Sequence, residues 1–190
     1  MSRLADEFFE EFVRSRSAHL YKLALLLTGH QADAQDLLQV VLERAYRRRS
    51  ALVRDVDPEP YVRKAMVNAA IDRRRLLRRR REHPLEDIEP RAELRDPIGQ
   101  IADRDLVLRW LAMLPPRQRS VLVLRFWEDL PEAEVAKTLG CSLGTVKSHS
   151  SRGLARLREL AGPRPGIGGG RGSSPFDQHG QVGPARAEVP

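Results

Sequence analysis

The segment from Asp129 to Arg152 constrains the fold of this chain more than any other stretch. It contains two short runs of helical periodicity, and Gly140 and Ser142 separate them. Glycine adopts a positive φ at little cost, and a serine just before a helix supplies an N-cap oxygen. The pattern therefore predicts two helices that cross at a tight turn, which is the geometry of a helix-turn-helix.

Apolar residues at helical spacing on both helices predict a shared seam. The expected seam comprises Val135, Ala136, Leu139, Leu143, Val146, Leu154 and Leu157. The charge, in contrast, is divided between the helices. The first carries Glu132 and Glu134, whereas the second is basic, with a single acid at Glu159. A helix that lies against DNA phosphates should be basic, while its supporting helix need not be. A plain helical hairpin in a core is the alternative, and it does not require this division.

The composition favours a polyanionic partner. The 190 residues carry a formal net charge of +7, which suits nucleic acid or an anionic membrane surface. No apolar run is long enough to predict a membrane span. The single cysteine, Cys141, excludes an internal disulfide and a cysteine zinc cluster, so we expect a reducing cytoplasmic location.

Helical periodicity also predicts an all-α domain at residues 6–81, with helices at about 6–28, 32–48 and 59–80. Its expected interior residues are Phe8, Phe12, Leu20, Leu23, Ala24, Leu27, Leu37, Leu38, Val41, Leu42, Ala45, Val62, Ala65, Met66, Ala69 and Leu76. Residues 82–97 are acidic and contain prolines, so we expect a linker. A second helical domain is expected at 98–161, followed by a disordered, glycine-rich tail at 162–190. The predicted fold class is thus all-α, with two small helical domains.

The chain offers little for catalysis. Its five histidines are scattered without a pair at metal-ligand spacing, and no glycine-rich phosphate loop follows an apolar strand. We therefore expect neither an enzyme nor a bound cofactor or metal.

A second basic element ends the third helix, where Arg73, Arg74 and Arg75 are followed by four more arginines up to Arg81. Such a cluster repels itself unless a polyanion neutralises it, which indicates a phosphate-binding surface. A solvated basic face is the alternative. The helix at 33–46 instead combines acids and amides with exposed aliphatic positions, and it suits either docking on another protein's helices or an ordinary surface.

Four motifs follow one another along the chain: Asp33–Gln39 with Arg44–Tyr46, then Tyr61–Arg73, then Leu114–Arg119, then Gly144–Ser148. Together they resemble bacterial RNA polymerase sigma factors of the sigma-70 family, in the extracytoplasmic-function group and its SigE-like subgroup. The resemblance covers residues 8–161. It implies that residues 6–81 are sigma region 2 and residues 98–161 are sigma region 4.

The resemblance implies a role for each part. Region 2 would bind core polymerase at the β′ clamp helices and capture and melt the −10 element, while region 4 would read the −35 element and contact the β flap. The implied polymerase-binding residues are Asp33, Asp36, Leu37, Gln39 and Leu42. The implied −10 residues are Tyr61, Arg63, Asn68, Asp72, Arg73, Arg74 and Arg75. The −35 residues are Ser142, Thr145, Ser148 and His149 at base edges and Lys147, Arg152 and Arg156 at phosphates.

The expected function is promoter-specific initiation by a factor that is monomeric when free, with core RNA polymerase and promoter DNA as partners. Whether an anti-sigma factor is a further partner stays open. Two alternatives also stay open: a stand-alone helix-turn-helix regulator and a general nucleic-acid-coating protein. The chain departs from relatives at Val40, where they usually carry Glu, and at His149 and Ser150, where they often carry Arg and Leu. The linker acids would either screen the arginine cluster or merely keep a spacer soluble.

Overall fold

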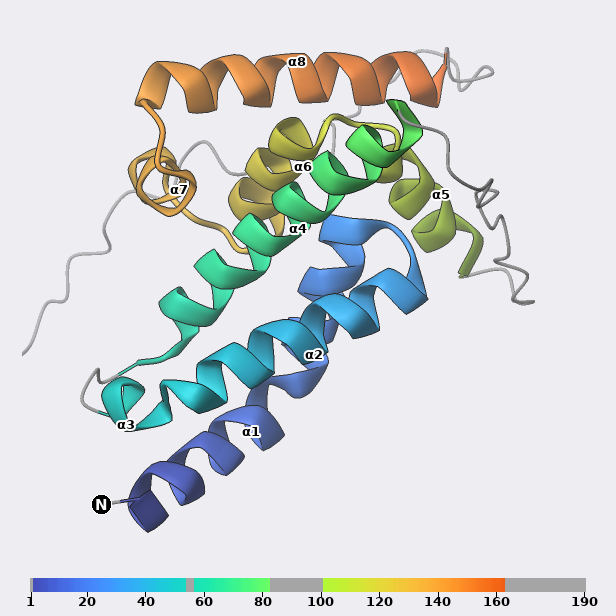
Figure 1. The fold of residues 1–190 in the computed structure, drawn as a ribbon. Helices are drawn as coiled ribbons and strands as arrows, with labels where there is room; N and C mark the ends of the chain where they lie inside the picture. The colour runs from blue at the N-terminus through green and yellow to red at the C-terminus, as the bar shows by residue number, and fades with distance from the viewer. Residues whose placement is uncertain (1, 54–56, 83–100, 163–190) are drawn as a thin grey trace, which may run out of the picture. The chain divides into compact units, whose positions relative to one another are not determined.

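The computed structural model describes residues 2–53, 57–82 and 101–162, and these residues form helices and no strands (Figure 1). The elements are α1 (Ser2–Thr28), α2 (Gln31–Arg47), α3 (Arg49–Leu52), α4 (Glu59–Glu82), α5 (Ile101–Ala112), α6 (Pro116–Leu122), the π-helical turn η1 (Val123–Trp127), α7 (Glu132–Leu139) and α8 (Leu143–Ala161). The all-α prediction is confirmed. The predicted linker and tail and the side chains of Arg74, Arg75 and Leu76 lie outside the described part.

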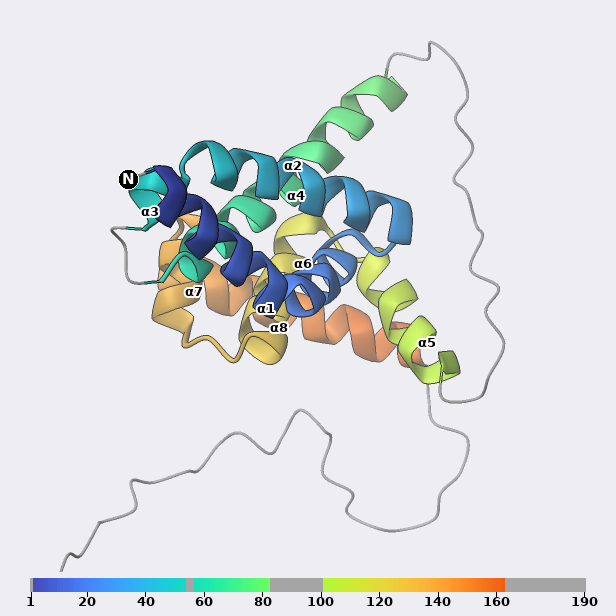
Figure 2. The same cartoon turned by 90° about the horizontal axis from the view of Figure 1, so that it is seen from below.

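Helices α1, α2 and α4 pack against one another around a common core. Leu23, Val41 and Met66 contribute one fully buried side chain from each helix. Figure 2 shows α1 and α2 side by side, with the C-terminal turns of α4 continuing past α2. The basic end of α4 therefore extends beyond the helix that supports it.

The buried stripe of α1 differs from the prediction near its start. Phe9 is buried rather than Phe8, because the stripe begins at Ala5 and continues through Phe9 to Phe12. The Phe9 ring packs edge-on against Tyr46 of α2, with ring centroids 5.6 Å apart. This contact with Tyr46 accounts for the burial of Phe9 rather than Phe8.

The sequence predicted helices at about 32–48 and 59–80, but not the short helix α3 that lies between them. Its Leu52 is buried and joins the core of α1, α2 and α4. Burial of this apolar side chain stabilises the packing of the segment against the core.

The turn between α7 and α8 has the predicted chemistry. Gly140 ends α7 with a φ of +61°, and the backbone N–H of Cys141 donates to Ala136 O at 3.0 Å. Ser142 then caps α8, because its Oγ accepts a hydrogen bond from the N–H of Thr145 at 3.2 Å. The helix-turn-helix prediction is confirmed at the level of its turn.

The predicted seam is only partly correct. Val135, Ala136 and Val146 are buried together in the main core. Leu143 is 49% exposed instead, since the first turn of α8 lies beyond the end of α7. Leu154 and Leu157, farther along α8, pack in a second cluster with apolar residues of α5 and α6. Helix α8 has 19 residues and α7 has eight, so the later turns of α8 extend past α7 and pack against this second cluster.

The two predicted domains share packing within one compact unit, Met1–Leu160. Val121 and Leu124 belong to the same core cluster as α1, α2 and α4. At the contact, Gly29 has a φ of +85°, and a Cβ built there would lie 2.8 Å from Ala112 Cβ. The division of the chain at residues 81 and 98 stays a prediction.

Candidate nucleic-acid interface

The exposed face of α8 carries most of the residues predicted to contact the −35 element. At about 100° per residue, Thr145, Ser148, Arg152 and Arg156 fall within an arc of about 80°. Lys147 points about 100° away from Ser148 on the helical wheel, so it lies on the opposite flank. Both Arg152 and Lys147 are exposed. The two flanks together could contact phosphates on either side of a groove.

The two hydroxyls at the start of α8 are already engaged with each other. Ser142 Oγ and Thr145 Oγ1 lie 2.9 Å apart, and Ser142 Oγ also accepts from the backbone of Thr145. A base edge at this position would compete with the helix cap. Ser148, also half-buried on α8, makes no hydrogen bond of this kind to the described residues, so its hydroxyl is less constrained.

His149 differs in character from its neighbours on α8. It is half-buried, and its Nδ1 has no hydrogen-bond partner among the described residues. Burial lowers the pKa of His149 below 6.5, and the charges of Arg117 and Arg152 lower it further. The ring is therefore neutral near pH 7, and it suits a base edge better than a phosphate.

Three of the predicted −10 residues form a stripe along α4. Tyr61, Asn68 and Asp72 lie within an arc of about 40°, because they are seven and four residues apart. Asn68 and Asp72 are exposed, whereas Tyr61 is half-buried under the guanidinium of Arg48, 5.9 Å from its ring centroid. The stripe presents one aromatic face and two polar side chains.

Two of the predicted −10 arginines, Arg63 and Arg73, do not lie on that stripe. Arg73 donates to Asp33 Oδ1 at 2.6 Å and to Asp36 Oδ2 at 3.2 Å. The sequence placed these two acids at the polymerase contact, so the structure joins two sites that were predicted separately.

The predicted polymerase-binding residues of α2 divide by exposure. Asp36 and Gln39 are exposed, and Asp33 and Leu42 are half-buried. Leu37 is only 3% exposed and belongs to the core, so it supports the surface rather than forming it. Val40 is 39% exposed beside Gln39 and is the apolar contact available on this face.

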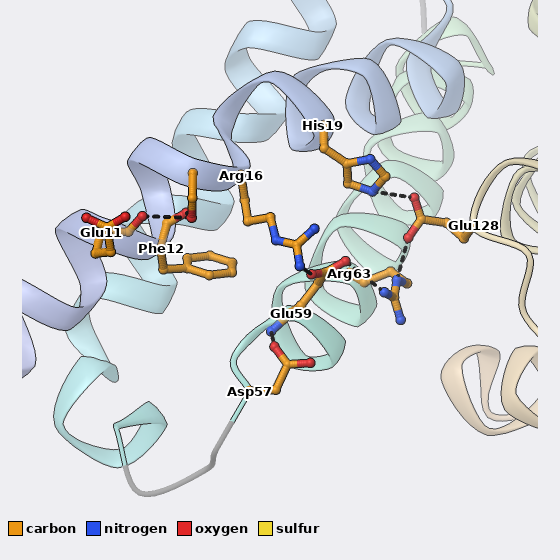
Figure 3. Close-up of polar contacts among 9 residues, drawn as sticks. Glu11, Phe12, Arg16, His19, Asp57, Glu59, Arg63 and Glu128 are labelled. Atoms are coloured by element: carbon orange, nitrogen blue, oxygen red, sulfur yellow. Dashed lines mark hydrogen bonds and ion pairs between the residues drawn. The ribbon is translucent and has the colours of Figure 1, made fainter. Parts of the chain in front are cut away.

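Arg63 connects α4 to a residue far along the chain. Its Nε donates to Glu128 Oε2 at 2.7 Å, and its Nη2 donates to Glu59 Oε1 at 3.1 Å (Figure 3). His19 of α1 approaches the other oxygen of Glu128, with its Nε2 at 2.8 Å from Oε1. Sequence reasoning missed His19 and Glu128, because no local periodicity relates residues that far apart.

Among the described helices, none combines the length and the apolar character that a membrane span requires.

Comparisons with known proteins cover both halves of this interface. The model described as "Sigma-70 region 2" matches residues 12–81, and the model described as "Sigma-70, region 4" matches residues 104–157. The chain is 44% identical over 151 residues to the RNA polymerase sigma-E factor of Streptomyces avermitilis, covering 80% of this chain and 83% of that protein.

More distant relatives agree. The chain is 34% identical over 157 residues to the ECF RNA polymerase sigma factor SigM of Mycobacterium tuberculosis, covering 81% of this chain and 77% of that protein. Its fold is similar to that of the sigma factor RpoE in complex with the anti-sigma factor NepR from Bartonella quintana. That match has a TM-score of 0.66 at 24% identity and covers 82% of this chain and 97% of the other.

Proposed function

The chain belongs to the sigma-70 family of bacterial RNA polymerase sigma factors, in the extracytoplasmic-function group, and we propose how its residues divide the work. It acts in promoter-specific transcription initiation with core RNA polymerase. The observation that carries the proposal is the placement of two basic helices, α4 and α8, in the parts matched by region 2 and region 4. Each presents polar side chains suited to DNA on its exposed side.

In this proposal α8 binds the −35 element. Lys147, Arg152 and Arg156 contact phosphates from both flanks of the helix, and Ser148 and His149 face base edges. Ser142 and Thr145 contribute mainly by holding the start of α8 in place. Discrimination then depends on few direct contacts together with DNA shape.

Helix α4 captures the −10 element through Tyr61, Asn68 and Asp72, with the arginines from Arg73 onward on the phosphates of the separated strand. The exposed face of α2 around Asp36, Gln39 and Val40 docks on the polymerase. The factor carries no catalytic group of its own, works in the cytoplasm and is monomeric when free.

An anti-sigma factor belongs to the proposal as a further partner. Two solved structures of similar fold are complexes: RpoE with the anti-sigma factor NepR, and CnrH with the cytosolic domain of CnrY, at TM-scores of 0.66 and 0.57. The shared fold is the observation that supports this part of the proposal. The proposal commits to no particular anti-sigma sequence.

In vitro transcription tests the proposed function. The pure chain is added to core RNA polymerase with a random promoter library, and the transcripts are sequenced. We expect initiation at promoters that share −35 and −10 elements. If the chain bound specific DNA but left the polymerase without promoter-directed transcripts, the stand-alone regulator would be the correct function instead.

Tyr61 also leads to a prediction about promoter choice. Stacking contributes about 1–3 kcal/mol per base, so the one aromatic on the α4 stripe contributes little toward melting several base pairs. We expect opening only at favourable −10 sequences. Permanganate footprinting of the holoenzyme should show reactive thymines at matched promoters and few at mismatched ones. Efficient opening of mismatched −10 elements would contradict this.

A further inference from the structure

A buried carboxylate in the part matched by the region 4 model lies beside an arginine and a histidine of the part matched by the region 2 model. Glu128 follows η1, within the part matched by the region 4 model, and its side chain is 2% exposed. Its two oxygens contact Arg63 Nε of α4 and His19 Nε2 of α1, both from the region 2 part (Figure 3). Burial of a carboxylate is costly without such partners, so these contacts hold Glu128 in place.

A second carboxylate completes the cluster. Glu59 Oε1 accepts from Arg63 at 3.1 Å, and Glu59 Oε2 lies 3.1 Å from Arg16 Nη2. The backbone N–H of Glu59 donates to Asp57 Oδ1 at 2.9 Å, which fixes the start of α4. Arg16, His19 and Arg63 therefore converge on one place from two helices. They lie near the start of the same helix that carries the Tyr61 stripe.

A metal ion fits this cluster poorly. The ligand atoms of His19, Glu59 and Glu128 lie within 4.8 Å of one another, which is close enough to share an ion. Two guanidiniums, however, already balance the two carboxylates. A divalent cation would add two positive charges beside Arg16 and Arg63, so the electrostatics disfavour a metal ion in this cluster.

A phosphodiester has the chemistry of the group that Glu128 presents. Both offer two oxygens that share one negative charge, and guanidinium groups bind either in the same fork geometry. Trp127 lines one side of the site, since its ring stacks on His19 at a centroid distance of 6.4 Å. The geometry around Glu128 is that of an occupied anion site.

We propose that Arg16, His19 and Arg63 form a phosphate-binding site for the separated promoter strand, and that Glu128 occupies this site in the free chain. The inference rests on the proposed function and adds Arg16 and His19 to the −10 surface. DNA and Glu128 compete for the same side chains, so a strand can enter only when the region 4 part moves Glu128 away. The apparent DNA affinity of the free chain is therefore the affinity of the open site multiplied by the fraction of molecules in which the site is open.

The test compares the full-length chain with Glu128→Gln, which keeps the shape of the side chain and removes its charge. Binding of a fluorescein-labelled single-stranded oligonucleotide is followed by anisotropy at several salt concentrations. We expect Kd to fall about tenfold, a typical coupling between competing sites. The slope of log K against log salt should steepen by about 0.7 for each phosphate gained.

The matched control is Glu134→Gln, an exposed acid on α7 that removes the same charge away from the site. It should change Kd less than twofold. Adding Arg16→Gln or His19→Gln to Glu128→Gln should abolish the gain. Equal affinities for Glu128→Gln and Glu134→Gln would overturn the proposal, as would a gain that persists without Arg16 and His19.

A second measurement does not depend on the buried position. Arg16 is half-exposed, so Arg16→Gln should fold, and its holoenzyme should bind promoter DNA at least threefold more weakly than that of the control Arg14→Gln. Equal binding by these two variants would also overturn the proposal. Transcription by the unaltered chain with core polymerase reports the proposed function separately. If that transcription succeeds while the variants show unchanged oligonucleotide affinities, the phosphate-binding site is refuted and the proposed function stands.

Discussion

At the scale of single residues, Arg119 has the most demanding environment. Its side chain is 1% exposed, and its guanidinium donates to Leu27 O at 2.9 Å and to Ala112 O. These carbonyls lie in the last turns of α1 and α5, where the helix itself supplies no partner. A cation there also complements both helix dipoles. One side chain thus caps two helices from the two predicted domains.

Replacing this cap should destabilise the whole fold. Arg119→Met keeps most of the volume but removes the hydrogen bonds from the guanidinium to both carbonyls, and a hydrogen bond to a charged group contributes about 1.5–3 kcal/mol. We expect the free energy of unfolding to fall by about 2–5 kcal/mol in urea titration. The exposed neighbour provides the control, because Arg117→Met should stay within about 0.5 kcal/mol. A similar loss for both would show that Arg119 acts only through charge.

His149 gives the fold a pH dependence with a definite sign. Burial and the charges of Arg117 and Arg152 lower its pKa in the folded chain, while the unfolded chain titrates near 6.5. Between the two values the unfolded state binds more protons, so stability is complete above about pH 6.5 and falls as the pH falls below it.

The substitution His149→Gln should flatten this loss, as measured by urea midpoints from about pH 8 to pH 5. The exposed His30→Gln is the matched control and should retain the unaltered profile. If the midpoint of the His149 variant fell as steeply with acid as that of the unaltered chain, another group would be responsible.

At the scale of elements, the helix-turn-helix depends on the start of α8. Ser142 satisfies the N–H of Thr145, and such caps contribute about 1 kcal/mol. Ser142→Ala should lower the free energy of unfolding by about that amount in urea titration. It should also weaken −35 binding, because the first turn of α8 frays. Ser151→Ala lies on the exposed middle of α8 and should change stability by less than about 0.5 kcal/mol.

Helix α4 shows how far the sequence could predict an element and its site. Periodicity predicted the helix and its inward Val62 and Met66, and the family resemblance supplied Tyr61, Asn68 and Asp72. It did not reveal that Arg63 is held by acids, since Glu128 lies 65 residues away. Local spacing fixes the direction in which a side chain points, whereas its partner depends on tertiary packing.

At the scale of the whole molecule, the contact between the two predicted domains depends on the turn after α1. Gly29 combines a φ of +85° with a close approach to Ala112. Gly29→Ala should therefore cost about 1–2 kcal/mol for the backbone conformation alone, with a further cost for displacing α5. Urea titration would measure the loss, and limited proteolysis would show faster cleavage within 101–162.

Gly144→Ala is the matched control for that experiment. A Cβ there would meet only Ser142 Oγ, at an ordinary 3.8 Å, so the variant should be at least as stable as the unaltered chain. Equal stability of the two glycine variants would indicate that the turn after α1 adapts without strain.

The sequence by itself determined the main helices other than α3, the turn at Gly140, the cap at Ser142, the division of charge and the family, because each follows from local spacing or from motifs in order. Only the tertiary structure decided that Phe9 rather than Phe8 is buried, that Leu143 is exposed, and that Arg63 and Arg73 are paired with carboxylates. The physical reason is that burial and ion pairing depend on which element arrives opposite a side chain. Glu128 is distant from Arg63 in sequence, so the local pattern around Arg63 does not indicate this partner.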